Sequence, residues 1–410
     1  MKEKKLPYNV ILLSVDAMGQ PDANELLSLP AFDYFTKNGV FTDNMKTVYP
    51  TITYPIHTSV ITGKYPDGHM IDHNEPWQPD VSEDMRKWHW AVKDIGRRTL
   101  WHAATEKKLA VASLLWPVSG KAAGVIKWDF PEVLPLPGEI PVIKMMKYAS
   151  KLWLAKTELK YGKQRVSLKR KDIDDYMALL SEKLYEQENY PDLLTVHFAD
   201  TDDTRHNEGV GSEADKAAIL RMNDRVQRLI DAVKRRGIED RTIFIVMSDH
   251  GQQNVTEGYI PLDEKLAETG LGRAQSFGRG AYIYAEDIEK TKAFLKQNEK
   301  ELHIKYVLNN AELRKIHAPA NITLAVQAEK GYGYVDRNCT CDHKGDHGFG
   351  LEEPEAQVLL WLAGGPFKKG ERIKGADIVD IAPTIADILG LSMPDCDGRI
   401  LKEAYEKTSD

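Results

Sequence analysis

Short apolar runs alternate with helical patterns along this chain, and that alternation constrains its fold more than any other feature of the sequence. Residues 9–15 read NVILLSV, residues 242–247 read TIFIVM, and comparable runs occupy residues 109–115 and 193–198. Near-continuous apolarity over so few residues indicates strands that are buried on both faces. Such strands, separated by helices, predict an α/β fold with a mostly parallel central sheet and helices on both of its faces.

The segments between and after these strands complete the predicted domain. Residues 213–236 carry apolar side chains at helical spacing, residues 358–362 read as a late strand, and residues 378–389 read as a closing helix ended by Gly390. Two segments break the rhythm. Residues 117–189 are rich in Pro, Trp and Lys and suggest an insertion, and residues 280–335 suggest a small α+β inserted subdomain. We therefore expect residues 1–410 to form one α/β domain with two additions.

The bulk composition excludes several classes of partner. The chain has 55 basic and 62 acidic residues, a net charge of −7, and no long basic run, so we expect no nucleic acid polymer as partner. The sequence has no run of 18 apolar residues and no export signal, which predicts neither a membrane span nor a membrane partner. Cys339, Cys341 and Cys396 are too few for a disulfide framework, so a cytoplasmic location is expected. Cys339, Cys341 and His343 could bind a metal, but no fourth ligand is evident, and free loop thiols are the simpler interpretation.

Aspartates and histidines follow the predicted strands at the edge where open α/β sheets bind their ligands. Any one of these residues could be a turn former or a helix cap. Their joint occurrence in one α/β chain instead predicts a metal site. A mixed set of carboxylates and imidazoles suits zinc better than magnesium or calcium. The candidate ligands are Asp16, Asp202, His206, Asp249, His250 and His347.

A threonine-rich segment offers the nucleophile that a two-metal hydrolase would need. Residues 47–66 contain Thr47, Thr51, Thr53, Thr58 and Thr62. A helix beginning near Pro55 would place Thr53 at its amino end, where backbone N–H groups favour an anion. From the residues alone, Thr53 is equally interpretable as a helix cap or as a nucleophile.

Several motifs, taken together and in order, resemble the nucleotide pyrophosphatase/phosphodiesterase branch of the alkaline phosphatase superfamily. They are Asp16, residues 51–74 (TITYPIHTSVITGKYPDGHMIDHN), the Asp202 and His206 pair, residues 248–251 (SDHG) and residues 345–348 (GDHG). The resemblance runs from residue 9 to about residue 350, and residues 376–391 with the following DGR extend it almost to the end.

The resemblance implies an alkaline phosphatase-like fold and a phosphodiesterase or nucleotide pyrophosphatase activity with a phosphothreonine intermediate. The substrate would be a small phosphate ester or a nucleotide-like molecule. Asn74 stands 21 residues after Thr53, the spacing of the family's phosphate-binding Asn, which favours Thr53 over Thr51. Tyr54 would stack on a base or pack against the leaving group, and Trp116 would line the substrate side. One zinc ion would take Asp16, Asp249, His250 and Thr53, and a second would take Asp202, His206 and His347.

Two departures from the family pattern leave the substrate open. Ile56 replaces a usual Asn, and residues 117–189, which should shape substrate choice, match no counterpart. The alternative function on the same core is a phosphomonoesterase or a hydrolase similar to phosphonoacetate hydrolase, with Lys121 and Lys127 as candidate contacts for an extra negative charge. Both lysines could equally be solvated. Sulfate esters are disfavoured because Thr53 cannot be oxidised to the sulfatase aldehyde, and a mutase or an inactive scaffold fits the motifs less well.

Overall fold

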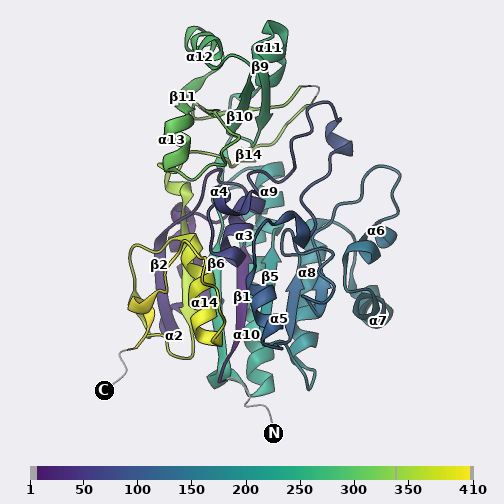
Figure 1. Ribbon diagram of the computed structural model, residues 1–410. Helices are drawn as coiled ribbons and strands as arrows, with labels where there is room; N and C mark the ends of the chain where they lie inside the picture. The colour runs from purple at the N-terminus through teal and green to yellow at the C-terminus, as the bar shows by residue number, and fades with distance from the viewer. Residues whose placement is uncertain (1–6, 338, 407–410) are drawn as a thin grey trace.

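An eight-stranded sheet forms the centre of the computed structural model, which describes residues 7–337 and 339–406 (Figure 1). The strand order is β16-β2-β15-β6-β1-β5-β3-β4. The strands are β1 (Asn9–Val15), β2 (Gly39–Lys46), β3 (Val111–Leu114), β4 (Trp128–Phe130), β5 (Leu193–Phe198), β6 (Thr242–Ser248), β15 (Gln357–Ala363) and β16 (Glu371–Arg372).

Strand direction explains how distant residues reach one edge of this sheet. β6, β1, β5, β3 and β4 run parallel, which confirms the predicted mostly parallel α/β sheet. Val15 is in register with both Phe198 and Ser248, so β1, β5 and β6 end at the same level. β15 runs antiparallel to β6 and β2. The start of β15 therefore lies at the edge where the parallel strands end, and the loop before it carries His347 to that edge.

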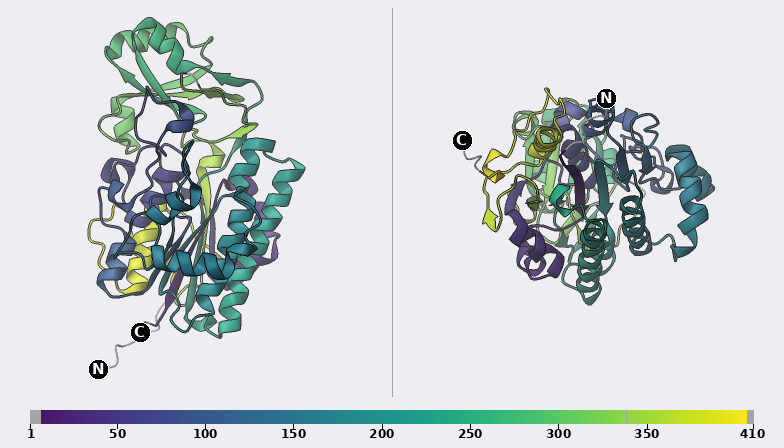
Figure 2. Two further views of the ribbon diagram at one scale, coloured as in Figure 1. Left: turned by 90° about the vertical axis from the view of Figure 1, so that its right-hand side faces the viewer. Right: turned by 90° about the horizontal axis from the view of Figure 1, so that it is seen from below.

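Helices cover both faces of the sheet, as predicted (Figure 2). Alternate residues of β1 enter opposite cores: Val10 and Leu12 pack on one face, and Ile11, Leu13 and Val15 on the other. The first face is covered by α3 (Thr53–Thr62), α5 (Leu100–Glu106) and α14 (Ile381–Leu389), and the second by α2 (Pro30–Asn38), α8 (Arg170–Tyr185) and α10 (Glu213–Arg236).

A second, four-stranded sheet lies beyond the ligand-bearing edge of the main sheet (Figure 1). Its order is β11-β12-β10-β9, and all its pairings are antiparallel. This unit begins before residue 280, because α11 and β9 contribute to its core. Its elements are α11 (Leu262–Thr269), β9 (Gly272–Ser276), β10 (Gly280–Ala285), α12 (Ile288–Gln297), β11 (Ile304–Asn309), α13 (Asn310–Lys315) and β12 (Leu324–Ala328).

Residues 117–189 are only partly an insertion. β4 extends the main sheet beside β3, and α8 packs against α10, so both belong to the core. β4 spans three residues, too short for its period to be recognised in the sequence. Between β4 and α8, α6 (Pro141–Tyr148) and α7 (Lys151–Tyr161) lie on the flank of the domain.

Smaller elements connect these layers. Among the helices that the structure describes, none is long and apolar enough to cross a membrane. The remaining elements are α1 (Ala23–Leu27), α4 (Pro66–His69), α9 (Asp200–Glu208), the pair β7 (Gln253–Asn254) with β14 (Gly345–Asp346), and the pair β8 (Gly258–Ile260) with β13 (Tyr332–Tyr334).

We predict that Gly348→Ala destabilises the protein more than Gly124→Ala does. Both glycines have positive φ, 79° and 81°, so each substitution costs roughly 1 kcal/mol of backbone strain. A Cβ at residue 348 would also overlap the Phe277 carbonyl oxygen, whereas nothing lies within 4 Å at residue 124. Urea unfolding should show an additional loss of about 1–3 kcal/mol at residue 348. Equal losses would show that the loop beside His347 has more room than the structure gives it.

Candidate active site

A cavity of about 310 Å³ lies between the ligand-bearing edge of the main sheet and the second sheet. Most of the residues singled out from the sequence line it, although they come from distant parts of the chain. Asp249 and His250 lie beneath its floor and are fully buried. The lining includes Asp16, Thr53, Tyr54, Asn74, Asp202, His206 and His347.

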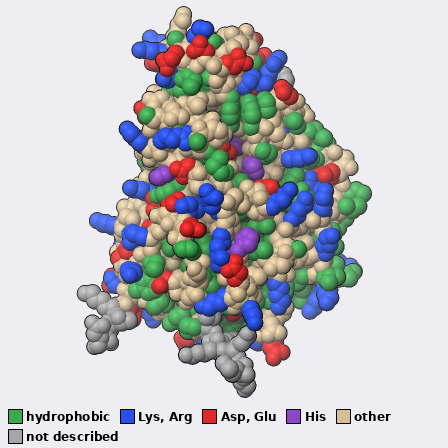
Figure 3. All heavy atoms as spheres, in the orientation of Figure 1, with side chains coloured by type: hydrophobic (Ala, Val, Ile, Leu, Met, Phe, Trp, Pro, Cys, Tyr) green, Lys and Arg blue, Asp and Glu red, His purple; other side chains and the backbone are tan. Residues whose placement is uncertain are grey.

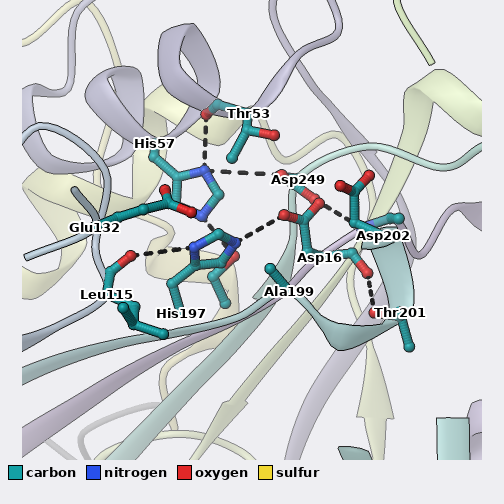
Figure 4. A network of polar contacts seen from close by, with 12 residues as sticks. Asp16, Thr53, His57, Leu115, Glu132, His197, Ala199, Thr201, Asp202 and Asp249 are labelled. Carbon is teal, nitrogen blue, oxygen red and sulfur yellow. Dashed lines mark hydrogen bonds and ion pairs between the residues drawn. The ribbon is translucent and has the colours of Figure 1, made fainter. Parts of the chain in front are cut away.

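Asp16, Asp249 and His250 bring one ligand atom each to within 4.8 Å of one another. His250 Nε2 lies 3.6 Å from Asp16 Oδ1 and 3.4 Å from Asp249 Oδ2. Thr53 Oγ1 lies 3.3 Å from the same nitrogen. Among the described residues, neither Asp16 Oδ1 nor Asp249 Oδ2 has a hydrogen-bond partner, although both atoms are buried. Figure 4 shows Asp16, Asp249 and Thr53 converging from three segments.

This first group fits a tetrahedral metal ion. Ligand atoms about 2.0–2.2 Å from zinc in a tetrahedron lie about 3.3–3.6 Å from one another. Thr53 Oγ1, Asp249 Oδ2 and Asp16 Oδ1 lie 3.3, 3.4 and 3.6 Å from His250 Nε2. A buried carboxylate oxygen without a partner is costly unless a cation or a donor reaches it. The unpartnered oxygens of Asp16 and Asp249 therefore point to a cation.

Asp202, His206 and His347 form a second group of the same kind. His206 Nε2 lies 3.3 Å and His347 Nε2 lies 3.8 Å from Asp202 Oδ1. His206 Nδ1 lies 2.9 Å from the Gly345 carbonyl oxygen, which it donates to when protonated, and this orients Nε2 toward Asp202. Three protein ligands leave a coordination position for substrate or water.

Charge and burial shift the pKa values of both groups. His250 and His347 are the imidazoles kept neutral, whereas a metal ion would have to displace a proton from Asp16 and His206. Burial, with the neighbouring carboxylates, raises the pKa of Asp16 well above its usual value. Burial lowers the pKa of His250 to about 4 and that of His347 to about 3, so both imidazoles are neutral and able to ligate a metal. Burial opposes the charged forms of Asp202 and His206, but their attraction outweighs it, which lowers the pKa of Asp202 and raises that of His206 to about 9.

Thr53 is the first residue of α3, and its hydroxyl faces the first group. The helix begins here because Ile52 is extended, with ψ of 157°, and Pro55 suits the first turn. Of the other candidate threonines, Thr51 donates its hydroxyl hydrogen to the Phe349 carbonyl and Thr47 to the Asp249 carbonyl. Both hydroxyl groups are therefore already bound to backbone carbonyl groups. Thr53 alone of these three presents its hydroxyl to an imidazole of the site.

Asn74 is fixed to the start of the same helix. Its Oδ1 accepts a hydrogen bond of 3.0 Å from the Tyr54 backbone N–H. The amide oxygen is therefore used by the protein, and Asn74 also lines the cavity, where its Nδ2 can serve as a donor.

The two aromatic candidates differ in position, since Tyr54 lines the cavity and Trp116 does not. Tyr54 is fully buried and packs edge to face on Trp88, with ring centroids 5.3 Å apart, so its ring has no free face for stacking. Trp116 is also fully buried, and its Nε1 donates to the His57 carbonyl oxygen behind α3. The expected substrate contact of Trp116 is wrong in this structure, because the side chain packs against α3 instead of lining the cavity. Trp88 takes the cavity position instead.

Two buried histidines that the sequence reasoning missed support the first group. His197 Nε2 lies 2.8 Å from Asp16 Oδ2, which leaves Oδ1 to face the site. His57 lies four residues after Thr53, and its ring bridges the Thr53 carbonyl and Ser14 Oγ at 2.8 Å each. A histidine and a serine inside otherwise apolar strands were the available signals, since buried polar side chains need partners.

The two lysine side chains considered as substrate contacts lie away from the cavity. Lys121 and Lys127 are exposed and sit over the rings of Tyr148 and Trp128. Arg170, the first residue of α8, lines the cavity instead, with its NH2 group 2.7 Å from Glu132 Oε1.

The loop before β14 shows a different grouping from the one considered for its thiols. His343 groups with His206 and Asp346 as potential metal ligands. In the described part of the chain, neither Cys339 nor Cys341 belongs to such a group, and both are free thiols that line the cavity.

Comparison with known proteins assigns the family. The family model described as "Type I phosphodiesterase / nucleotide pyrophosphatase" matches residues 10–350. This chain belongs to that family. The resemblance drawn from the motifs is thereby confirmed, and the chain is placed among hydrolases of phosphate esters.

Individual relatives are distant but extend over most of the chain. Ectonucleotide pyrophosphatase/phosphodiesterase family member 7 of Rattus norvegicus is 22% identical over 97% of this chain and 86% of its own length. Venom phosphodiesterase 2 of Crotalus adamanteus is 22% identical over 88% of this chain and 43% of its own length. The structure of murine ectonucleotide pyrophosphatase/phosphodiesterase 5 matches with a TM-score of 0.74 at 17% identity, over 97% of this chain and all of the other. That similarity confirms the alkaline phosphatase-like fold.

We predict that His197→Ala weakens metal binding by about 10–100-fold, because Asp16 Oδ2 loses the imidazole that orients it. Chelator-treated protein should show a melting temperature that rises with added zinc, since a ligand of the folded state stabilises it. The variant should need correspondingly more zinc for the same rise. His69→Ala is the matched control, because that imidazole is equally buried but pairs with Ser59 outside the site. An unchanged zinc dependence in His197→Ala would contradict the supporting role.

Proposed function

We propose that this protein is a two-zinc phosphodiesterase or nucleotide pyrophosphatase in which Thr53 attacks the phosphorus of a small ester. The observation that carries the proposal is the position of the Thr53 hydroxyl. It lies at the start of α3, 3.3 Å from His250 Nε2, beside carboxylate oxygens that have no hydrogen-bond partner among the described residues. A hydroxyl held among metal-ligating groups at a helix amino end is suited to in-line attack on an anion.

Each group of ligands would have a separate task. Asp16, Asp249 and His250 would hold one zinc ion next to Thr53. Asp202, His206 and His347, which form the second group, would hold the other. When bound, two such ions supply Lewis acidity to the attacking and leaving oxygens, about 3.5–4 Å apart in typical sites.

The residues of the chain carry out two displacements in sequence. In the first, the Thr53 oxygen forms a bond to phosphorus, the bond to the leaving oxygen breaks, and the Thr53 proton passes through solvent to the leaving group. In the second, a water oxygen attacks phosphothreonine, the bond from phosphorus to the Thr53 oxygen breaks, and the proton released by the water returns to Thr53. Asn74 would hold a non-bridging oxygen through its amide nitrogen, because its amide oxygen is already fixed by the Tyr54 N–H. Two inversions predict net retention at phosphorus.

Relatives support a threonine nucleophile and a nucleotide-like substrate. The structure of murine ectonucleotide pyrophosphatase/phosphodiesterase 5 with TM-score 0.74 includes an inactive threonine-to-alanine variant in complex with AMP. That protein thus needs a threonine for activity and binds a nucleotide. We propose both properties for this chain, with Thr53 as the threonine.

We predict that Thr53→Ala abolishes hydrolysis of a p-nitrophenyl nucleotide diester and leaves metal content and the melting temperature close to those of the wild type. The side chain is 8% exposed and small, so its loss removes the nucleophile with little change in packing. Thr53→Ser keeps a hydroxyl at the same place and should retain measurable turnover. Quenched wild-type reactions should show phosphate bound to the chain, and Thr53→Ala should not. Undiminished hydrolysis by Thr53→Ala would refute the assignment.

A specific observation favours a second candidate, hydrolysis of a substrate that carries an additional negative charge, such as a phosphomonoester or a phosphonate. Arg170 lines the cavity, and it forms an ion pair with Glu132. Glu132 is 5% exposed and fixes the guanidinium in place. A guanidinium offers five donors, so several remain for a substrate oxygen. Arg170 thus takes the role that the sequence suggested for Lys121 and Lys127.

We predict that removing the Arg170 charge lowers monoester turnover more than diester turnover. Because Arg170→Gln alone would leave the buried Glu132 carboxylate unpaired, the double variant Arg170→Gln/Glu132→Gln is the better test. For this variant, kcat/KM for a p-nitrophenyl monoester should fall about tenfold more than for the matched methyl diester, the effect of one charge-assisted contact. Lys127→Gln, at an exposed lysine away from the cavity, should change kcat/KM for neither ester. Equal losses for both esters would remove Arg170 from substrate selection.

A further inference from the structure

The flank formed by α6, α7 and the segment that follows them exposes an unusual set of apolar side chains. Leu152, Leu159 and Val166 are 81%, 87% and 86% exposed, the highest values among the large apolar side chains that the structure describes. Of the 13 such exposed side chains, seven lie between residues 140 and 168. We call this surface the α6–α7 face; its apolar members are Ile140, Val142, Ile143, Leu152, Leu159, Val166 and Leu168.

The same face is strongly basic, although the protein as a whole is acidic. Residues 140–169 contain eight Lys and Arg, of which Lys144 is buried, and one acidic residue, Glu158, whereas the whole chain carries a net charge of −7. Figure 3 shows basic and apolar side chains interspersed along the right-hand edge, where Figure 1 places α6 and α7. In the described structure no ion pair is formed by Lys147, Lys151, Lys156, Lys160, Lys163 or Lys169.

The exposed leucines are not needed to pack α7 onto the domain. Leu154 and Thr157 are buried, and Trp153 packs against the core from the inner side of the helix. Leu152 and Leu159 are seven residues apart and so lie on one side of α7, with Lys156 between them on the same stripe. The helix therefore has a satisfied inner face and a second, outer face of leucine and lysine.

We propose that the α6–α7 face docks the protein on an anionic lipid surface, with the leucines in the interface and the lysines on the lipid head groups. Apolar side chains among lysines on a surface helix are suited to this contact, because lysine stems lie along apolar surface while the ammonium reaches the head groups. A symmetric contact with a second copy would bring the uncompensated lysines of both copies together, which disfavours self-association. The contact is peripheral and independent of the proposed function; it replaces the expectation of no membrane partner with a surface contact that spans nothing.

Vesicle co-sedimentation of the full chain tests the proposal. Vesicles of phosphatidylcholine alone and of phosphatidylcholine with phosphatidylglycerol serve as probes, at low and high salt. We expect binding only to the anionic vesicles and a decrease with salt. Lys156→Gln/Lys163→Gln should lower the partition coefficient more than tenfold, at roughly fivefold for each lysine. Leu152→Ser/Leu159→Ser should lower it comparably without changing the melting temperature, because both side chains are exposed.

A matched control separates the face from general surface hydrophobicity. Leu220→Ser removes a leucine that is 54% exposed on α10, and this variant should bind like the wild type. Absence of wild-type binding to anionic vesicles, or binding that all variants retain, would overturn the proposal. Sedimentation velocity tests self-association through the same face. If the wild type is a dimer that Leu152→Ser/Leu159→Ser dissociates, and if it does not bind vesicles, the face serves self-association and lipid docking is rejected.

Discussion

Repulsion among buried carboxylates at one edge of the sheet is the constraint on which the site depends. Asp16, Asp202 and Asp249 approach one another, and burial with the neighbouring carboxylates raises the pKa of Asp16 well above its usual value. Such a cluster persists in a fold only where cations or donors balance it. The chain provides donors on one side, since Asp249 Oδ1 accepts from the Ala17 and His250 N–H groups. Asp16 Oδ1 and Asp249 Oδ2 have no hydrogen-bond partner among the described residues, which favours a cation at this place.

Sheet topology gathers this cluster without long loops. The ends of β1, β5 and β6 are level, so residues that directly follow them meet at one place. The antiparallel direction of β15 adds the residues that precede it, including His347. The start of α3 completes the site from above the sheet, and Asn74 binds the Tyr54 N–H of that start. Strand register and one helix end thus fix the positions of the reacting groups.

The sequence predicted the parts of this structure whose signal is local. β1, β5 and α10 have the predicted bounds, because each is a continuous apolar or amphipathic run. The candidate ligands could be named because each follows a strand in the sequence and belongs to a recognisable motif. Their meeting was an inference from the parallel topology. The antiparallel direction of β15 could not be predicted, since a buried strand has the same pattern in either direction.

Other features depend on packing between distant segments and have no local signal. β4 is only three residues long, and its place in the sheet is set by pairing with β3. Trp116 was expected beside the substrate, but the space behind α3 holds its ring, and its N–H reaches the His57 carbonyl oxygen. His197 was missed because one polar residue in an apolar strand does not reveal which carboxylate it meets. The role of Arg170 depends on α8 starting at the cavity wall, which no spacing in the sequence indicates.

In the proposed function, chemistry and selectivity come from different parts of the chain. The ligands and Thr53 lie on strand ends and a helix start that the core holds rigidly. Glu132 and Arg170, which line the same cavity, come from residues 117–189. That segment also bears the α6–α7 face. The same stretch of chain would therefore contact both the charge of the substrate and the proposed lipid surface. Within this segment, β4 and α8 belong to the core, since β4 pairs with β3 and Asp174 of α8 accepts from the Ala199 and Asp200 N–H groups just after β5. The stretch between β4 and α8 takes no part in the pairing of β1, β5 and β6. An enzyme built this way can acquire a new substrate while keeping the register that assembles its metal ligands.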